Sequence, residues 1–384
     1  MPRLRIDTDY LGARLSELLA IPSPTGYTDR VVRACSAELQ RLGLRFELTR
    51  RGAIRAIYPG KHRRAARAVV SHLDTIGAQV KFVKDNGRLE VIPIGHWSAR
   101  FAEGARCTIF TDKGSYRGTI LPLKASGHTF HHEVDSLPVG WDYVELRVDA
   151  LARSRREVKK LGIDIGDIVA IDPQPEFLDN GFIVSRHLDN KGGVAVMLAA
   201  IEAMCRENVE TPVDIHWLFT IEEETGIGAS SILSHDIAAM VAVDNGTTAP
   251  GQGSREFGVT VCMADMAGPF DWHLTKKLVE LCRDNDIVYQ KDVFRHYRSD
   301  SASAIVAGFD VRTALVTFGV DASHGYERIH MHALRSVAEL LTAYVTSPVK
   351  IARDARELGD LKGFTDQPTE EAEQDLSPDQ SNGI

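Results

Sequence analysis

The arrangement of apolar and polar residues after Phe182 alternates between runs of strand length and segments with helical spacing. Within residues 191–206, for example, Val194, Leu198 and Ile201 recur every three or four positions and therefore share one helical face. Strands that alternate with helices predict a mostly parallel sheet covered by helices on both faces. The expected strands are GFIVS, VDIHWLFTI, IAAMVAV, FGVTVCM and VRTALVTFG, and the expected helices cover residues 191–206, 229–234, 270–285 and 332–345.

The first half of the chain has two further patterns. Near the N-terminus, two helical segments are separated by IPSPTG, whose prolines and glycine interrupt a helix, and Thr28 can cap the second helix. Strands RFELTR, AIRAIYP and ARAVVS follow. From residue 84 to 175 the strands are short, as in LEVIPI, RCTIFT and YRGTILPL, and turns separate them, with one helix over 154–161. This pattern is typical of a small β-rich domain.

We therefore predict an α/β fold that carries an inserted domain. Residues 1–83 and 176–352 form the main, discontinuous domain, and residues 84–175 form the β-rich insertion. From Asp366 to the C-terminus there are six acidic residues, no basic residue and almost no apolar residue, which is too little to offset the entropy of ordering. Residues 353–384 are therefore expected to be a disordered acidic tail.

The composition is that of a globular protein and narrows the choice of partners. The 384 residues are 43% hydrophobic, and they contain neither a membrane-length apolar stretch nor the apolar core of a secretory signal, so no membrane partner is expected. The five cysteines are scattered and form no CxxC pair, which favours a cytoplasmic protein without disulfides. The net charge is −8, of which the tail supplies six, so the nearly neutral body gives no reason to expect nucleic acid. The basic stretch over residues 50–67 is interpreted as a surface hairpin, with a nucleic-acid or anion patch as the less favoured alternative.

Five polar segments share one position, because each follows the C-terminal end of an apolar strand. Parallel strands align these ends at one edge of a sheet, where α/β proteins place their active sites. All five segments contain a histidine or a carboxylate, which are residue types that bind divalent metals. The candidate ligands are His72 after ARAVVS, Asp189 after GFIVSR, Glu224 after IHWLFTI, Asp244 after IAAMVAV and His324 after VRTALVTFGVDAS.

These imidazole and carboxylate donors suit two divalent cations, with zinc favoured and cobalt or manganese as alternatives. Three carboxylates at close range would destabilise a fold unless cations compensated their charge. Two cations need more ligand positions than five single donors supply, so one carboxylate is expected to bridge, and we assign this role to Asp189. Asp74 lies two residues after His72 and is placed to accept the other imidazole N–H, which would orient the ring.

The acidic triplet that follows IHWLFTI offers a base beside a ligand. We assign Glu224 to a cation, Glu223 to the role of general base and Glu222 to solvent. A water between two cations has a lowered pKa, so Glu223 is expected to take its proton as the hydroxide attacks a carbonyl. The cations stabilise the oxyanion, and Glu223 passes the proton to the leaving amine. A purely structural site needs no such base, which disfavours the alternative of an inactive, metal-stabilised shell subunit.

The motifs HLD, DNKGG, EEETG and HGYE, together with the single Asp244, resemble those of dinuclear metallopeptidases. The long insertion lies between the first two candidate ligands, since His72 and Asp189 are 117 positions apart and the later intervals are 35, 20 and 80. This order resembles the tetrahedral aminopeptidase family, which includes glutamyl and deblocking aminopeptidases, over roughly Tyr10 to Val349. In the glutamate carboxypeptidase type the second domain falls between the last two ligands, and 80 residues are too few for it.

The resemblance implies exopeptidase action on the N-termini of small peptides, and it supports the roles of Glu223 and Asp74. It also implies two ligand sets around a shared carboxylate. The sets are His72, Asp189 and Asp244 for one cation and Asp189, Glu224 and His324 for the other. The resemblance further implies that the insertion mediates assembly of a homo-oligomer, which in this family is often a twelve-subunit tetrahedral shell with the active sites inside.

Some features depart from the family pattern. The segment at the bridging carboxylate reads Asp189-Asn190-Lys191, where the family usually has Asp-Asp-Arg. In RSDSAS, Ser299 and Asp300 stand where relatives often have Thr-Asp, and we assign them to the substrate pocket. The chain also resembles a bacterial subgroup linked to an acetylated glutamine-dipeptide osmoprotectant. The alternative function is therefore a related amidohydrolase that cleaves N-acylated or blocked dipeptides.

Three histidines lie close together in the insertion, within SGHTFHHEVD. We expect His128, His131 and His132 to be loop or interface residues. A separate metal site is the less favoured alternative. His128 is also a candidate for contact with substrate in a neighbouring subunit's active site.

Overall fold

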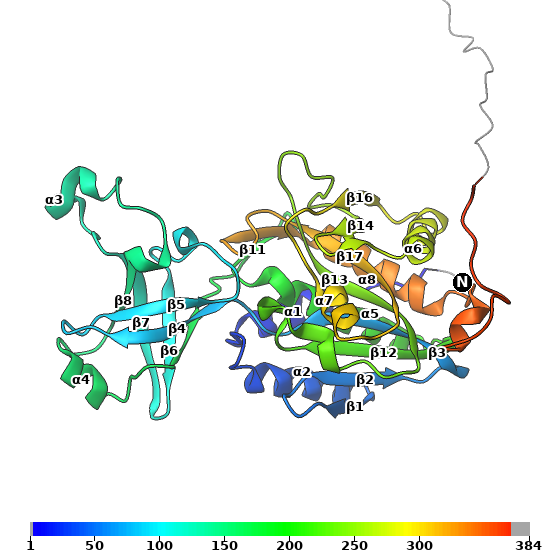
Figure 1. Cartoon of the computed structure of the whole chain (residues 1–384), viewed down its shortest axis with the longest axis horizontal. Helices are drawn as coiled ribbons and strands as arrows, with labels where there is room; N and C mark the ends of the chain where they lie inside the picture. Colours follow the sequence, from blue (N-terminus) through cyan, green and yellow to red (C-terminus); the bar gives the residue numbers. More distant parts are fainter. Residues whose placement is uncertain (1–2, 370–384) are drawn as a thin grey trace, which may run out of the picture.

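The computed structural model describes residues 3–369, in which a sheet flanked by helices lies beside a smaller barrel (Figure 1). In spatial order the strands of the sheet are β1 (Arg45–Leu48), β2 (Ile54–Tyr58), β12 (Val213–Thr220), β3 (His62–His72), β13 (Ile237–Thr247), β17 (Arg312–Val320), β14 (Val259–Asp265) and β15 (Gly268–Pro269), with β16 (Tyr289–Val293) also beside β14. The central strands β12, β3, β13 and β17 are parallel, while β2 and β14 pair antiparallel with β12 and β17. The α/β prediction is confirmed, and the sheet is mixed, with its parallel part at the centre.

Helix α5 (Leu188–Arg206) is the central helix of this part of the molecule. It packs on β3 and β13, and α1 (Thr8–Leu19) and α8 (Met331–Thr346) pack against it. Most of its side chains are buried, because GGVAVMLAAI offers small and apolar residues on every side. Gly193 permits the close approach of α5 to the sheet, since a Cβ there would collide with Asn190 and Ser71. The remaining helices are α2 (Asp29–Arg41), α6 (Trp272–Asp284) and α7 (Asp300–Val306).

The insertion folds as a closed six-stranded barrel with its own apolar core. Its strands are β4 (Gly77–Val83), β5 (Leu89–Ile94), β8 (Val144–Val148), β7 (Gly114–Pro122), β6 (Arg106–Thr111) and β9 (Ile168–Ile171), in order around the barrel. The barrel also carries the short helices α3 (Gly127–Phe130) and α4 (Arg155–Lys160), which lie toward its outer end in Figure 1. The barrel begins at Gly77, before the expected boundary at residue 84, because β4 follows β3 almost directly and the change in sequence pattern comes only after β4.

A third, small sheet is antiparallel and links two distant parts of the chain. It consists of β10 (Glu176–Phe177), β11 (Phe182–Ser185) and β18 (Glu327–His330), in that order. The strand GFIVS is thus not part of the main sheet, which corrects the expectation that it lies parallel to the others. Only four residues of this segment are in the strand, and an apolar run of that length does not reveal which partner it pairs with.

Further segments differ from their predictions. The helix expected over 229–234 is the short 3-10 helix η5 (Gly228–Ser231). Helix α7 was not expected, because DSASAIV has only seven residues and a polar first turn. In the basic stretch, Arg67 is buried and donates to the carbonyl oxygens of Tyr344 and Ser347, so this residue is not on the surface as predicted.

The predicted tail is partly ordered. Ala352–Ala355 form a short 3-10 helix, and the Asp354 carboxylate accepts hydrogen bonds from Arg312, which ties the segment to β17. Residues 370–384 of the predicted tail lie outside the described residues. Among residues 3–369, none of the helices has the length and apolar character required to cross a membrane.

Candidate metal centre

The candidate ligands meet at one site, close to the ends of the central strands. His72 is the last residue of β3, and Asp244 lies near the end of β13. Glu223 and Glu224 belong to the short 3-10 helix η4 (Glu223–Thr225) just after β12, while His324 lies in the turn that follows β17. Parallel pairing of these four strands brings their ends to the same edge, as the sequence predicts.

Asp189 reaches the site by another route. The small sheet brings β11 alongside β18, and the chain then turns at His187, which has a left-handed backbone with φ 67°. Asp189 follows in the first turn of α5, and the Asp189–Asn190 peptide bond is cis. The carboxylate therefore enters from beside the main sheet and not from the end of one of its strands.

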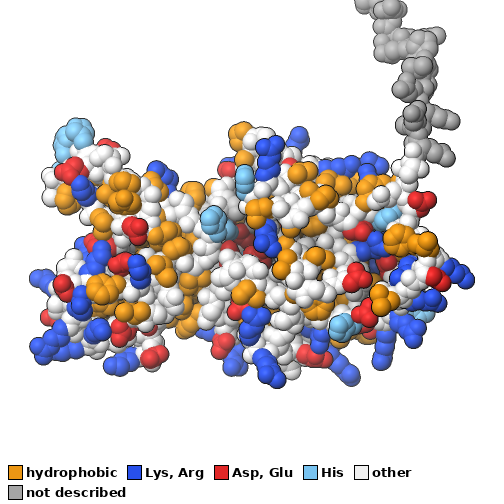
Figure 2. All heavy atoms as spheres, in the orientation of Figure 1, with side chains coloured by type: hydrophobic (Ala, Val, Ile, Leu, Met, Phe, Trp, Pro, Cys, Tyr) orange, Lys and Arg blue, Asp and Glu red, His pale blue; other side chains and the backbone are white. Residues whose placement is uncertain are grey.

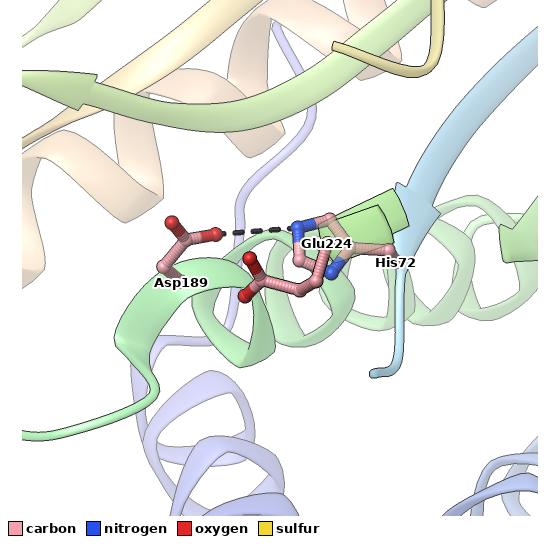
Figure 3. Close-up of side chains that lie close together, drawn as sticks. All are labelled: His72, Asp189 and Glu224. Atoms are coloured by element: carbon pink, nitrogen blue, oxygen red, sulfur yellow. Dashed lines mark ion pairs between the residues drawn. The ribbon is translucent and has the colours of Figure 1, made fainter. Parts of the chain in front are cut away.

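The Asp189 carboxylate lies between two histidines. Its Oδ1 is 3.2 Å from Nε2 of His72, and its Oδ2 is 3.1 Å from Nε2 of His324. The same His324 nitrogen lies 3.3 Å from Oε2 of Glu224, and Nε2 of His72 lies 3.8 Å from Oδ1 of Asp244. Figure 3 shows the side chains of His72, Asp189 and Glu224 converging on one space. All five predicted ligands are thus near neighbours.

The residues fit divalent cations. Two triads, which share His72, have ligand atoms that all lie within 4.8 Å of one another. They are His72, Asp189 and Glu224, and His72, Glu223 and Asp244. The Nε2 atom of His72 is buried and lacks a hydrogen-bond partner among the described residues, although it faces carboxylate oxygens. A buried, unpaired imidazole nitrogen among carboxylates is the arrangement expected of a metal ligand.

The electrostatics of the site also favour the binding of cations. Burial raises the pKa of Glu224 and Asp244, and the negative charge of Asp189 adds to this shift. Burial alone would lower the pKa of His72, but Asp189, Asp244 and Asp74 outweigh it and raise that pKa. Without a cation, the cluster thus favours extra protons that reduce its negative charge. Bound cations would replace those protons.

Asp74 connects the His72 strand end to the Glu223–Glu224 turn. Nδ1 of His72 lies 2.9 Å from the backbone oxygen of Asp74, which is the nearest acceptor, and 3.5 Å from its carboxylate Oδ1. The carboxylate instead accepts the backbone N–H groups of Glu223 and Glu224 at 3.2 and 3.3 Å and the hydroxyl of Thr25 at 2.7 Å. Orientation of the ring, expected from the Asp74 side chain, therefore comes mainly from its backbone, while the side chain holds the turn.

The three consecutive glutamates have different surroundings. Glu224 also accepts the backbone N–H of Ile76 at 3.1 Å, so its carboxylate is fixed beside the barrel connection. Oε2 of Glu223 lies 3.7 Å from Nε2 of His72, and burial raises the pKa of Glu223 well above its usual value. Glu222 points to the surface, where it pairs with Arg51. Of the three glutamates, Glu223 is thus the one whose carboxylate lies at the centre without a hydrogen bond to another described residue.

Ser299 and Asp300, which were assigned to the substrate pocket, are buried. Ser299 is buried and caps α7 through Ser301, and Asp300 is buried with its carboxylate bonded to the Thr220 hydroxyl at 2.6 Å and to the Ala229 N–H at 2.8 Å. Asp300 thus joins α7 to β12 and η5, and neither residue lines an open pocket. His128 lies in α3 at the outer end of the barrel, away from the site of its own chain (Figure 1). Figure 2 shows a hollow between barrel and sheet that contains acidic and histidine side chains.

Comparison with known proteins places this geometry in a family. The chain matches the M42 glutamyl aminopeptidase family over residues 52–340. It is 37% identical to the protein named "Putative aminopeptidase YhfE" of Bacillus subtilis (strain 168) over 336 residues, which cover 87% of this chain and 97% of that protein. The chain belongs to the M42 family.

Solved structures show the same fold at low sequence identity. The TET aminopeptidase of the marine sediment archaeon Thaumarchaeota archaeon SCGC AB-539-E09 superposes with a TM-score of 0.82 at 17% identity, over 93% of this chain and 99% of the other. The Pyrococcus horikoshii TET1 peptidase, described as able to assemble into a tetrahedron or a large octahedral shell, gives a TM-score of 0.78 at 21% identity, over 88% and 100%. As an M42 member the chain is a hydrolase of the metallo-aminopeptidase class.

Three residues of this M42 site were not assigned roles from the sequence. Asn245 donates from Nδ2 to Oδ2 of Asp189 at 2.6 Å. Lys191, which stands where the family usually has arginine, is buried and donates to the backbone oxygens at the end of α1. Glu327 is 1% exposed and accepts two backbone N–H groups of the site. Lys191 lies in the motif DNKGG and Glu327 in the motif HGYE, but only the fold shows what these two side chains contact.

Proposed function

We propose that this M42 chain removes N-terminal residues from small peptides and uses two divalent cations to do so. The observation that supports this most directly is the placement of Asp189, whose two carboxylate oxygens face different histidines, His72 and His324. A carboxylate in that position can contact two cations at once, which is the arrangement used by two-metal hydrolases.

We assign the predicted ligand sets to these two cations. His72, Asp189 and Asp244 would hold the first cation, and Asp189, Glu224 and His324 would hold the second. When bound, the cations supply Lewis acidity and positive charge at the site. Zinc is the favoured metal, with cobalt and manganese as alternatives, because imidazole and carboxylate donors suit all three.

Glu223 is the residue that moves a proton in this proposal. Its carboxylate takes a proton from the attacking water and then gives it to the nitrogen of the leaving amine. Oε2 of Glu223 lies 3.7 Å from Nε2 of His72, so this carboxylate stands beside the proposed ligands, where it can hold the proton between these two steps. Asp74 keeps Glu223 in place through the backbone N–H of that residue.

We further propose that the protein acts as a homo-oligomer in a reducing compartment such as the cytoplasm. Shell assembly is stated for the Pyrococcus horikoshii relative, and a tetrahedral shell of twelve subunits is the form we expect here. All five cysteines are free, which fits a reducing compartment. The native mass, measured by light scattering, tests the oligomer directly, and a monomeric mass contradicts it.

The proposed activity is tested by removing and restoring metal. The purified protein is treated with a chelator, reloaded separately with zinc, cobalt or manganese, and assayed on aminoacyl amides and on N-acetylated dipeptide amides. We expect hydrolysis of the free-amine substrates only after a metal is restored. Cleavage of only the acetylated substrates would favour the related amidohydrolase, and hydrolysis that is unchanged by the chelator would contradict the metal mechanism.

A further inference from the structure

Glu327 is a buried carboxylate that joins two parts of the metal centre. Its Oε2 accepts the backbone N–H of Asp189 at 3.2 Å, and its Oε1 accepts the backbone N–H of His324 at 2.9 Å. The side chain is almost completely buried. We infer that Glu327 is a positioning residue that sets the placement of Asp189 relative to His324 and thereby the affinity for the cation these two residues share. This inference rests on the proposed function.

The strands beside Glu327 explain why it can contact both segments. Glu327 is the first residue of β18 and pairs with Ser185 at the end of β11, so the small sheet aligns the two chain segments. On the other side, Asp321 and Arg328 exchange backbone hydrogen bonds at 2.9 and 3.1 Å, which closes the turn that contains His324. The carboxylate of Glu327 is thus enclosed between the turn before it and the start of α5.

The turn needs such support because His324 has an unfavourable backbone. Its φ of 62° is in the left-handed region, which is strained for a residue with a Cβ. The N–H of His324 points at Glu327, and the side-chain Nδ1 lies 2.9 Å from the backbone oxygen of His96. These two contacts hold the residue from both sides, so that Nε2 faces Asp189 and Glu224.

A carboxylate is the group that this position requires. Both oxygens accept, one from each N–H, and within residues 3–369 no other side chain is bonded to either N–H. Glutamine has the same shape but only one acceptor oxygen, and its amide N–H would face a backbone N–H. Aspartate keeps both acceptors on a shorter side chain. An unpaired buried N–H destabilises its segment and can change how the segment presents its ligand.

The test measures cation binding by the full chain, without substrate. Glu327→Gln and Glu327→Asp are compared with the wild type by equilibrium dialysis with cobalt and by the visible absorption of bound cobalt, which reports ligand geometry. The control is Asp292→Asn, because Asp292 is also a buried carboxylate that bonds a loop, at Ser254, but lies outside the cluster of ligands.

For Glu327→Gln we expect one cobalt to bind about 10- to 100-fold more weakly, with a changed spectrum and an unchanged circular dichroism spectrum of the metal-free chain. Glu327→Asp should recover part of the affinity, and Asp292→Asn should bind as the wild type does. If Glu327→Gln does not fold, Glu327→Asp alone decides, with weaker cobalt binding expected. Wild-type affinity and spectrum in the folded Glu327 variants would overturn the inference. A wild type that binds cobalt but hydrolyses no aminoacyl amide would overturn the proposed function instead.

Discussion

Oδ2 of Asp189 and Nε2 of His324 lie 3.1 Å apart, although the two residues are distant in sequence. Asp189 follows β11 of the small sheet, and His324 lies in the turn between β17 of the main sheet and β18. The other oxygen of Asp189 faces His72. This relationship makes Asp189 the centre of the cluster, and it explains why the remaining carboxylates can gather around it only with compensating positive charge.

Metal removal should lower thermal stability because the carboxylates then share the site without compensation. A cation at about 100 times its dissociation constant stabilises the folded chain by about 2.7 kcal/mol, which corresponds to a rise of several degrees in melting temperature. Differential scanning fluorimetry with and without chelator measures this shift. The same comparison on Asp189→Asn should give a much smaller shift, and an equal shift in both proteins would show that the cation binds elsewhere.

Replacement of the proposed base should abolish turnover and leave cation binding intact. We expect Glu223→Gln to lower kcat by about 10²- to 10⁴-fold, since the amide cannot accept the proton. The amount of metal bound per chain, measured by elemental mass spectrometry, should stay at the wild-type level. Glu222→Gln is the matched control, because Glu222 is the adjacent glutamate and pairs with Arg51 at the surface. Near wild-type turnover by Glu223→Gln would remove Glu223 from the mechanism.

Asp74→Asn should act through the turn that Asp74 holds. The carboxylate accepts the N–H groups of Glu223 and Glu224, and an asparagine offers one acceptor oxygen in place of two. We expect cation affinity to fall about 10- to 100-fold, with a smaller effect at saturating metal. Titration of the metal-free variant with zinc, monitored by calorimetry, measures this. Unchanged affinity would mean that the turn is held without this carboxylate.

Stability should depend on pH through Lys277, which is remote from the metal centre. Burial lowers the pKa of Lys277 to about 7, and the charges of Arg67 and Lys350 contribute, while Glu280 opposes them. The pKa of Lys277 is lower in the folded chain than in the unfolded chain, so the unfolded chain binds more protons between about pH 7 and 10. The free energy of unfolding therefore decreases as the pH falls through this range.

Lys277→Met removes this titration. We measure the free energy of unfolding of both proteins with urea and take the variant minus the wild type. We expect this difference to be larger at pH 7 than at pH 9 by on the order of 1–2 kcal/mol. An identical difference between the two proteins at both pH values would show that the lysine does not titrate in this range.

The sequence was sufficient to name the residues that meet at the candidate site but not all the routes by which they meet. His72, Glu224, Asp244 and His324 follow strands whose apolar runs are long enough to be recognised as parallel and central. Asp189 follows a strand of four residues, and its pairing with β18 depends on contacts that no local pattern encodes.

The surrounding polar residues were harder to predict for a related reason. Ser299 and Asp300 were assigned to the pocket, yet both are buried. Ser299 caps α7, and the Asp300 carboxylate accepts hydrogen bonds from Thr220 of β12 and Ala229 of η5. Glu327 stands in the motif HGYE, but only the fold shows that its two carboxylate oxygens accept the backbone N–H groups of Asp189 and His324. A buried carboxylate can be found in a sequence, whereas its partners require the tertiary structure.

The distribution of the ligands along the chain also affects when the metal can bind. His72 is made early, and His324 and Glu327 are made only after nearly all of the main sheet has been synthesised. Since chains fold from the N-terminus as they emerge, the growing polypeptide has carboxylates but no complete cage for most of its synthesis. Cations held by the proposed ligand set could therefore be captured only after His324 has been made, late in synthesis or after it.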